Sequence, residues 1–219
     1  MYTALPVTTE PRDWIDWHKQ YGDPASSLSR RLAVVRMRLR EALDGREGRL
    51  RLISMCAGQG VDVIPVLAES GRRDVEALLV ELDPRLAGIA EKAARAAGLD
   101  KVRVLCGDAA VTANYVDAVP ADIILAVGIF GNIIGADIEF TVKRLPMLAV
   151  PGATVIWTRG RFSEDDPMPE TIRRWFNEAG FEELAFDAPD DTRYRVGVNR
   201  LVRAPDAFDS RLTLFRFFR

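Results

Sequence analysis

Cysteine and histidine are scarce in this sequence of 219 residues, which contains two cysteines and one histidine. Cys56 and Cys106 stand far apart along the chain, so they do not form the framework of a small disulfide-stabilised domain. No group of histidines and cysteines has the spacing of metal ligands. We therefore expect no metal centre and a reducing environment.

A basic excess is also missing. The formal net charge is −2 and the pI is about 5.6, whereas proteins that bind nucleic-acid phosphates are usually basic. The densest positive segment is 30–40, RRLAVVRMRLR, whose arginines interleave with Leu32, Val35, Met37 and Leu39. This spacing favours the solvated face of an amphipathic helix over contact with nucleic acid. We expect no nucleic-acid partner.

Long apolar runs are absent as well. The longest, residues 123–136, is interrupted by three glycines and is shorter than the roughly 18 residues of a membrane-spanning helix. The N-terminal sequence MYTALPVTTEPRDW lacks the basic start and apolar core of a signal peptide. We expect a cytoplasmic protein without a membrane partner, which binds a small molecule and for which a homodimer is a possible assembly.

The first 45 residues read as a helical appendage. Residues 13–22 predict a short helix that begins at Asp13, and Ser26 or Ser27 is a good cap for a longer helix that runs to about Leu43. Asp44-Gly45 would end this second helix.

From Leu50 onwards, apolar strands alternate with helices, which is typical of an α/β domain with a parallel sheet. Asp83-Pro84 is a characteristic helix start, with Asp83 as the cap. We predict strands at 50–56, 75–82, 101–108, 121–127, 153–159 and 181–186, and helices at 62–69, 84–97, 137–148 and 170–179. A final strand lies at 194–202 or at 212–218, and we favour the second segment.

The turn after the first strand, in SMCAGQGVD (54–62), could hold a ligand. Its small residues Ala57, Gly58 and Gly60 would allow close approach to the backbone, and the following helix offers free N–H groups. A dinucleotide fingerprint requires a third glycine, which this loop lacks. On its own, the segment is compatible with a nucleotide site or with an ordinary tight turn.

Two carboxylates at strand ends support a nucleotide site. Glu81 follows the glycine turn by about 20 residues, where an acidic side chain can accept hydrogen bonds from both ribose hydroxyls. Because Asp83 caps the next helix, Glu81 is left for this role. Asp108 ends the third strand and could either bind the exocyclic amine of a purine or cap a helix.

Taken together, LISMCAGQGVD, LLVELDP, VLCGDAA and ADIILAVGIFGNI resemble, in order and spacing, the class I S-adenosylmethionine-dependent methyltransferases over residues 50–161. The resemblance implies a three-layer Rossmann-like α/β fold at 46–219, with a mostly parallel seven-stranded sheet and an antiparallel last strand. Residues 1–45 would then form an N-terminal helical lid. The implied cofactor is S-adenosylmethionine, which leaves as S-adenosylhomocysteine.

The resemblance also implies a set of cofactor contacts. The backbone from Cys56 to Gly60 would hold the methionine part, and Glu81 would bind the ribose. Leu82 would pack on the adenine, whose edge Asp108 and Ala109 would frame, and Val127 and Gly128 would lie beside the sulfonium. The complete predicted set is Cys56, Ala57, Gly58, Gln59, Gly60, Asp62, Glu81, Leu82, Asp83, Gly107, Asp108, Ala109, Val127 and Gly128.

The loop departs from the family at two positions. The family usually has an acidic residue in place of Ser54 and a glycine in place of Cys56, and Asp62 could supply the missing negative charge. A side chain at positive φ is unfavourable, so we expect Cys56 to have negative φ or the loop to differ locally.

The implied strand order separates Cys56 from Cys106 by two strand spacings, about 9–10 Å. That is too far for a disulfide, so we expect free thiols.

The acceptor is best read as a small molecule that is methylated on oxygen or nitrogen. The Asn/Asp-Pro-Pro-aromatic signature of amino-group methyltransferases is absent after the fourth strand. His18 and Tyr21 are the candidate catalytic residues, and His18 would be the base if one is used. Arg159 and Arg161 could bind an acidic acceptor or the cofactor carboxylate. The predicted acceptor-binding residues are Trp17, Phe130, Asn132, Arg159, Arg161 and Asn199.

Two other functions fit the same residues. An enzyme of this fold could bind the cofactor and carry out cyclisation or decarboxylation, with the sulfonium as an electrostatic aid. The altered glycine loop would also fit a binding module that does not catalyse a reaction.

Overall fold

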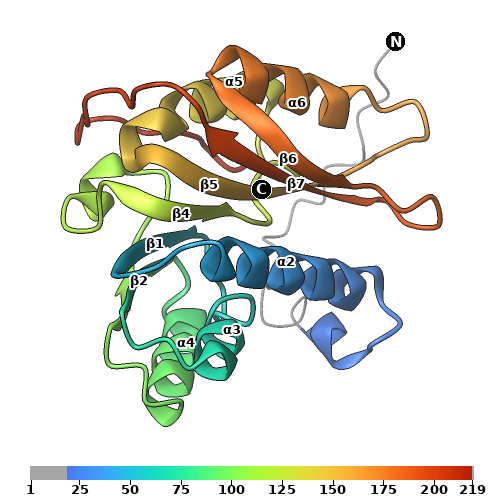
Figure 1. Cartoon of the computed structure of the whole chain (residues 1–219). Helices are drawn as coiled ribbons and strands as arrows, with labels where there is room; N and C mark the ends of the chain where they lie inside the picture. Colours follow the sequence, from blue (N-terminus) through green and yellow to red (C-terminus); the bar gives the residue numbers. More distant parts are fainter. Residues whose placement is uncertain (1–18, 219) are drawn as a thin grey trace.

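Seven strands form one mixed sheet in the computed structural model, which describes residues 19–218 (Figure 1). Their order is β3-β2-β1-β4-β5-β7-β6. The pairs from β3 to β5 are parallel, and β7 runs antiparallel to both β5 and β6. The strands are β1 (Leu50–Met55), β2 (Val75–Glu81), β3 (Val102–Cys106), β4 (Ala121–Ala126), β5 (Ala149–Gly160), β6 (Phe181–Asp187) and β7 (Tyr194–Leu201). The predicted Rossmann-like sheet is confirmed.

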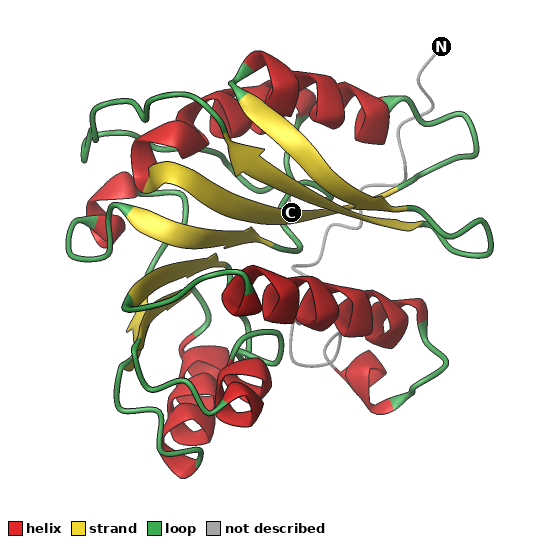
Figure 2. Ribbon diagram, in the orientation of Figure 1, coloured by secondary structure: helices red, strands yellow, loops and turns green. Residues whose placement is uncertain are grey.

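Helices cover both faces of this sheet, so the fold has three layers (Figure 2). One layer contains α2 (Ser27–Asp44), α3 (Ile64–Ser70) and α4 (Pro84–Ala96), and the other contains α5 (Gly135–Arg144) and α6 (Met168–Glu178). Four-residue 3₁₀ helices occur at η1 (Lys19–Gly22), η2 (Thr112–Tyr115) and η3 (Leu145–Leu148). Within residues 19–218, no helix is long and apolar enough to cross a membrane.

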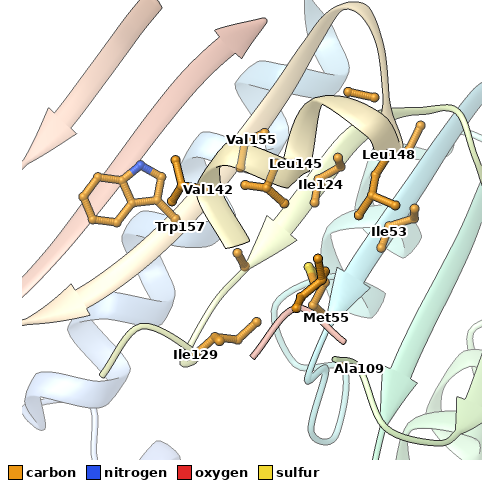
Figure 3. Close-up of a cluster of buried hydrophobic side chains, with 14 of the residues drawn as sticks. Ile53, Met55, Ala109, Ile124, Ile129, Val142, Leu145, Leu148, Val155 and Trp157 are labelled. Carbon is orange, nitrogen blue, oxygen red and sulfur yellow. The ribbon is translucent and has the colours of Figure 1, made fainter. Parts of the chain in front are cut away.

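Alternating strand residues build one core on each face of the sheet. Ile53 contributes to the core beneath α5 and α6, whereas its neighbour Leu52 contributes to the core shared with α2, α3 and α4. Figure 3 shows the first of these cores, with Met55 and Trp157 among its side chains. The Trp157 ring stacks on Phe176, with ring centroids 5.5 Å apart. Burial on both faces explains the nearly continuous apolar sequences of the central strands.

The predicted helix starts are confirmed at two sites. Ser26 caps α2, because its Oγ accepts a hydrogen bond from Ser29 N at 3.0 Å. Asp83 caps α4 in the same way, with Pro84 at the first helical position. The buried side of α2 joins the same core as the sheet. Of the predicted first helix, residues 13–22, only η1 lies within the described residues.

The arginine-rich face of α2 is held by intramolecular contacts. Arg38 forms a bidentate pair with Asp187, and Arg40 pairs with Glu69. Arg36 Nε donates to the backbone oxygen of Val61 at 2.8 Å. This pattern fits the predicted amphipathic helix, whose apolar side faces the core.

The favoured position of the last strand was wrong. Residues 194–201 form β7, which pairs with β5 and β6, whereas residues 212–218 make only isolated bridges at Thr213 and Phe217. We refer to residues 212–218 as the C-terminal strap. Both segments are rich in apolar residues, but only 194–201 follows β6 closely enough to form a hairpin with it.

The C-terminal strap covers the connection between β3 and β4, where η2 takes the place of a long helix. Its residues Leu214 and Phe215 are buried in the same core as Tyr115 of η2. Leu214 N donates to Ala110 O at 2.8 Å, and Phe218 N donates to Asn132 O at 3.1 Å. The strap therefore fixes two of the loops that follow the carboxyl ends of the parallel strands.

Candidate functional site

The loop after β1 lies at the carboxyl edge of the sheet and bends sharply. Cys56, Gly58 and Gly60 all have positive φ, at 54°, 55° and 69°. Of the two alternatives for Cys56, a negative φ is excluded, which leaves a loop that differs locally. A non-glycine residue in this region costs about 1–2 kcal/mol, so the strained loop is held by its surroundings: Ala57 N donates to Val80 O at 2.9 Å.

Glu81, the last residue of β2, ties this loop to the neighbouring strand. Its Oε2 accepts from Gly58 N at 2.7 Å, and its Oε1 accepts from Asp83 N at 2.9 Å. Burial raises the pKa of Glu81, opposed by the hydrogen bonds from Asp83 and Gly58. Each carboxylate oxygen keeps a second lone pair, so Glu81 can still accept two hydroxyl groups of a ligand.

The loop after β3 lies next to Glu81. Gly107 N donates to Glu81 O at 2.9 Å, and Asp108 Oδ1 accepts from Ala110 N at 2.8 Å. The Asp108 side chain thus caps the turn that follows it, and it remains exposed. Ala109 is buried, whereas Leu82 is 64% exposed. An exposed apolar side chain beside these strand ends is suited to contact with a flat ring.

Two buried polar atoms in the β1 region have no hydrogen-bond partner within residues 19–218: Ser54 Oγ and Asp62 Oδ1. Asp62 is only 6% exposed, and burial raises its pKa to about 6, against the opposing effect of backbone N–H groups, Arg31 and Arg36. Buried polar groups are normally satisfied by protein, water or ligand, so a donor or a positive charge would complete Asp62 Oδ1, and a donor or an acceptor would complete Ser54 Oγ.

Tyr21 of η1 belongs to the surroundings of Asp62. Burial raises the pKa of Tyr21; the positive charge of Arg31 lowers it and the negative charge of Asp62 raises it further. The phenol is therefore protonated near neutral pH and is a hydrogen-bond donor rather than a base. Trp17 and His18, the other predicted lid residues, lie outside the described residues.

The loop after β4 turns at Gly128, whose φ is 79°. Gly128 N donates to Thr158 Oγ1 at 2.9 Å, and Gly128 O accepts from Asn132 Nδ2 at 2.7 Å. Asn132 thus closes the loop. Phe130 was predicted to bind the acceptor, but its side chain is fully buried, and its ring centroid lies 6.1 Å from that of Trp157. It therefore packs in the core instead of facing an acceptor.

Asn199 was predicted to bind the acceptor, but it lies within β7, where it is buried and its Oδ1 accepts from Trp157 Nε1 at 2.8 Å. Arg159 and Arg161 do lie at the carboxyl end of β5, as predicted. Thr158 is a residue that the sequence did not reveal, because its partner Gly128 is distant in sequence.

Both thiols are free, as expected. Cys56 is half-buried and Cys106 is exposed, and β2 lies between β1, which Cys56 follows, and β3, which Cys106 ends. Burial raises the pKa of Cys56 well above its usual value, with further contributions from Glu81 and Asp108. Among residues 19–218, no group of three or more His, Cys, Asp or Glu side chains could hold a metal ion.

No protein-family model matches the chain, and no curated protein matches it by sequence. Its fold is similar to that of magnesium protoporphyrin IX methyltransferase from Synechocystis PCC 6803, solved with bound S-adenosylmethionine. The two share 15% identity and a TM-score of 0.63, over 85% of this chain and 90% of the other.

Two further structures are similar. One is the Burkholderia thailandensis 1,6-didemethyltoxoflavin-N1-methyltransferase with bound 1,6-didemethyltoxoflavin and S-adenosylhomocysteine, at 17% identity and TM-score 0.60, over 87% of this chain and 84% of the other. The second is a possible exported protein from Bordetella parapertussis, at 15% identity and TM-score 0.65, over 93% and 77%. At these identities the likeness establishes the fold.

Proposed function

On the premise that this chain has the fold of the class I S-adenosylmethionine-dependent methyltransferases, we propose that it transfers a methyl group from S-adenosylmethionine to oxygen or nitrogen of a small molecule. The observation that carries the proposal is the pair of buried polar atoms without partners, Ser54 Oγ and Asp62 Oδ1. They lie in the strand and loop that Glu81 ties to β2. Two similar structures contain this cofactor or its demethylated product.

The residues present fit this cofactor. The free lone pairs of Glu81 suit the two ribose hydroxyls, and the exposed Leu82 suits the adenine ring. Asp108 and Ala109 would frame the adenine edge, next to Gly107. The backbone of residues 56–60 would hold the methionine part, and Val127 and Gly128 would lie beside the sulfur. Asp83 contributes indirectly, through its backbone N–H to Glu81.

Asp62 takes over the role of the acidic residue that Ser54 replaces. A carboxylate with an unpartnered oxygen in a buried setting attracts the cofactor ammonium strongly, because solvent does not screen the interaction. Ser54 Oγ can accept a further hydrogen bond beside it. The opposite charge of a bound ammonium would also lower the pKa of Asp62 and keep it ionised.

The cofactor supplies an electrophilic methyl group when it is bound. The contribution of the chain is to align the acceptor with that methyl and to exclude water. Gly128 fixes the wall beside the sulfur through its bonds to Thr158 and Asn132. Tyr21, being protonated, can donate a hydrogen bond that orients the acceptor, and His18 is the proposed base for an acceptor that must lose a proton.

A methyl-transfer assay tests this function. The full chain is incubated with S-adenosylmethionine that carries a tritiated methyl group and with a panel of small hydroxyl and amine acceptors. We expect labelled product from at least one acceptor together with S-adenosylhomocysteine. Conversion of a panel compound without label transfer and without formation of S-adenosylhomocysteine would instead support cyclisation or decarboxylation. Tight cofactor binding without turnover across the panel would support a binding module.

Asp62→Asn is expected to remove a pH-dependent cost to stability. The folded-state pKa of about 6 lies above the ordinary value of 3.8, so ionisation of Asp62 lowers the stability of the wild type as pH rises from about 4 to 6. The difference in unfolding free energy between variant and wild type should therefore grow by about 2–3 kcal/mol from pH 4 to pH 7. Urea unfolding over a pH series measures it.

The same variant should bind S-adenosylhomocysteine about tenfold or more weakly at pH 7, because one charge-assisted contact is lost. Asp100→Asn, at an exposed position, is the control and should change neither quantity. A difference between Asp62→Asn and wild type that does not vary with pH, or an unchanged affinity, would contradict the role of Asp62.

A further inference from the structure

Arg159 is a buried cation at the carboxyl end of β5. It is 5% exposed, and burial lowers its pKa. Burying a charged group is costly unless it is paired and hydrogen-bonded. Arg159 precedes Gly160, the last residue of β5, and follows Thr158, whose hydroxyl accepts from Gly128 N. It is therefore next in sequence to the wall of the proposed methyl-transfer site.

The contacts of Arg159 do not satisfy this cation. Its Nη1 donates to the backbone oxygen of Gly160, while Nε is buried and has no hydrogen-bond partner in the described part of the chain. The Asp166 carboxylate is 3.7 Å from Nη2, beyond hydrogen-bond distance. Each oxygen of Asp166 accepts one backbone N–H, from Phe162 at 2.9 Å and from Met168 at 3.0 Å, so Asp166 attracts Arg159 through its charge and accepts none of its N–H groups.

Other arginines of this chain bind a carboxylate through Nε and Nη2, the two nitrogens that form one edge of the guanidinium. Five of them hold an acidic side chain through both nitrogens of this edge: Arg38 with Asp187, Arg72 with Asp74, Arg85 with Asp83, Arg173 with Glu183 and Arg211 with Asp209. Their side chains are between 17% and 86% exposed. Arg159, more buried than all five, lacks such a partner among the described residues.

A second arginine adds to the positive charge. Arg195 of β7 is the cross-strand neighbour of Arg159 and is 6% exposed. Its Nη1 donates to carbonyl oxygens of the β6–β7 connection, among them Thr192 O at 3.0 Å, so no carboxylate neutralises it through that nitrogen. Burial lowers the pKa of Arg195, and the charge of Arg161 lowers it further against the opposing effect of nearby carboxylates. Arginines therefore gather at this end of β5 and β7, where they favour an anionic ligand.

We propose that the small-molecule acceptor carries a carboxylate, which binds the Nε/Nη2 edge of Arg159. Planar guanidinium and carboxylate groups form two parallel hydrogen bonds in this arrangement. The Phe162 ring lies 4.2 Å from the guanidinium carbon and is 50% exposed. The ring covers the face of the guanidinium, so an acceptor bound at the edge would lie beside this exposed aromatic side chain. The assignment to an acceptor rests on the proposed function, whereas the carboxylate site itself does not.

The carboxylate of the cofactor is a less suitable occupant. The cofactor would lie over the loops after β1, β2 and β3, and β4 separates β1 from β5. Two strand spacings amount to about 9–10 Å. Arg159 is therefore positioned for a molecule on the far side of the transferred methyl group. Binding of S-adenosylhomocysteine should accordingly not depend on Arg159.

The test compares carboxylates with their neutral amides on the full chain. Benzoate, phenylacetate and succinate, each beside its amide at equal ionic strength, are titrated against the thermal unfolding midpoint. We expect at least one carboxylate to bind tenfold or more tightly than its amide, and Arg159→Gln to abolish this preference. Arg193→Gln, at an exposed residue on the same edge, is the matched control and should retain it.

Three results would overturn the proposal: no preference for any carboxylate in the wild type, a preference that survives Arg159→Gln, or an equal loss in Arg193→Gln. If Arg159→Gln does not fold, Arg159→Lys takes its place in the test. This variant keeps the charge but loses the bidentate edge, so it should still weaken carboxylate binding several-fold. Calorimetry with S-adenosylhomocysteine separates the two proposals. A carboxylate site without cofactor binding would leave the site standing and remove the methyltransferase function.

Discussion

Glu81→Ala is expected to weaken the binding of S-adenosylhomocysteine at least 100-fold. The ribose would lose two charge-assisted hydrogen bonds, each contributing about 1.5–3 kcal/mol, and every 1.4 kcal/mol changes an affinity about tenfold. The variant also leaves Gly58 N and Asp83 N without their acceptor, which loosens the glycine loop. Isothermal titration calorimetry measures the change.

Glu76→Ala is the matched control for this prediction. Glu76 lies on the same strand, towards its opposite end, and pairs with Arg49 at the surface. Its replacement should leave cofactor affinity unchanged. Glu81→Gln retains one oxygen acceptor and should bind with intermediate affinity. If Glu81→Ala binds as tightly as wild type while remaining folded, the ribose does not lie at Glu81.

Gly60→Ala is expected to lower the free energy of unfolding by about 3 kcal/mol. A Cβ at Gly60 would lie 2.5 Å from Ile64 Cδ1 and 3.0 Å from Leu79 Cδ2. Both partners are buried, so their movement is limited, and overpacking of this kind costs about 1–3 kcal/mol. The φ of 69° adds about 1–2 kcal/mol for a residue with a side chain. Urea unfolding measures the loss.

Gly71→Ala separates the two causes. Gly71 has nearly the same φ, 67°, but a Cβ there would meet no atom within 4 Å. This control should therefore show the backbone cost alone, about 1 kcal/mol, and leave cofactor binding intact. Equal destabilisation by the two variants would mean that the tight packing of the glycine loop against Ile64 and Leu79 contributes nothing.

Local chemistry made much of the fold predictable. Ser26 and the pair Asp83-Pro84 mark helix starts because capping depends on residues that are adjacent in sequence. The parallel order of the central strands then brings Glu81 and the glycine loop together at one edge. This is why short motifs in register were enough to anticipate the arrangement of the candidate cofactor site.

The parts that were missed depend on contacts between distant segments. The apolar C-terminal strap resembles a strand, and only its packing against η2 and the β4–α5 loop shows otherwise. Phe130 and Asn199 carry useful functional groups, but both turn towards Trp157 in the core. The cross-strand pairing of Arg159 with Arg195 follows from the position of β7, which the sequence pattern had assigned to another segment.

The central claim is that the carboxyl edge of β1, β2 and β4 binds S-adenosylmethionine. Calorimetric titration of the wild-type chain with S-adenosylhomocysteine, alongside NADH, tests it most directly. The account predicts saturable one-to-one binding of S-adenosylhomocysteine, with NADH much weaker. Absence of S-adenosylhomocysteine binding by the folded protein, or tighter binding of NADH, would contradict it.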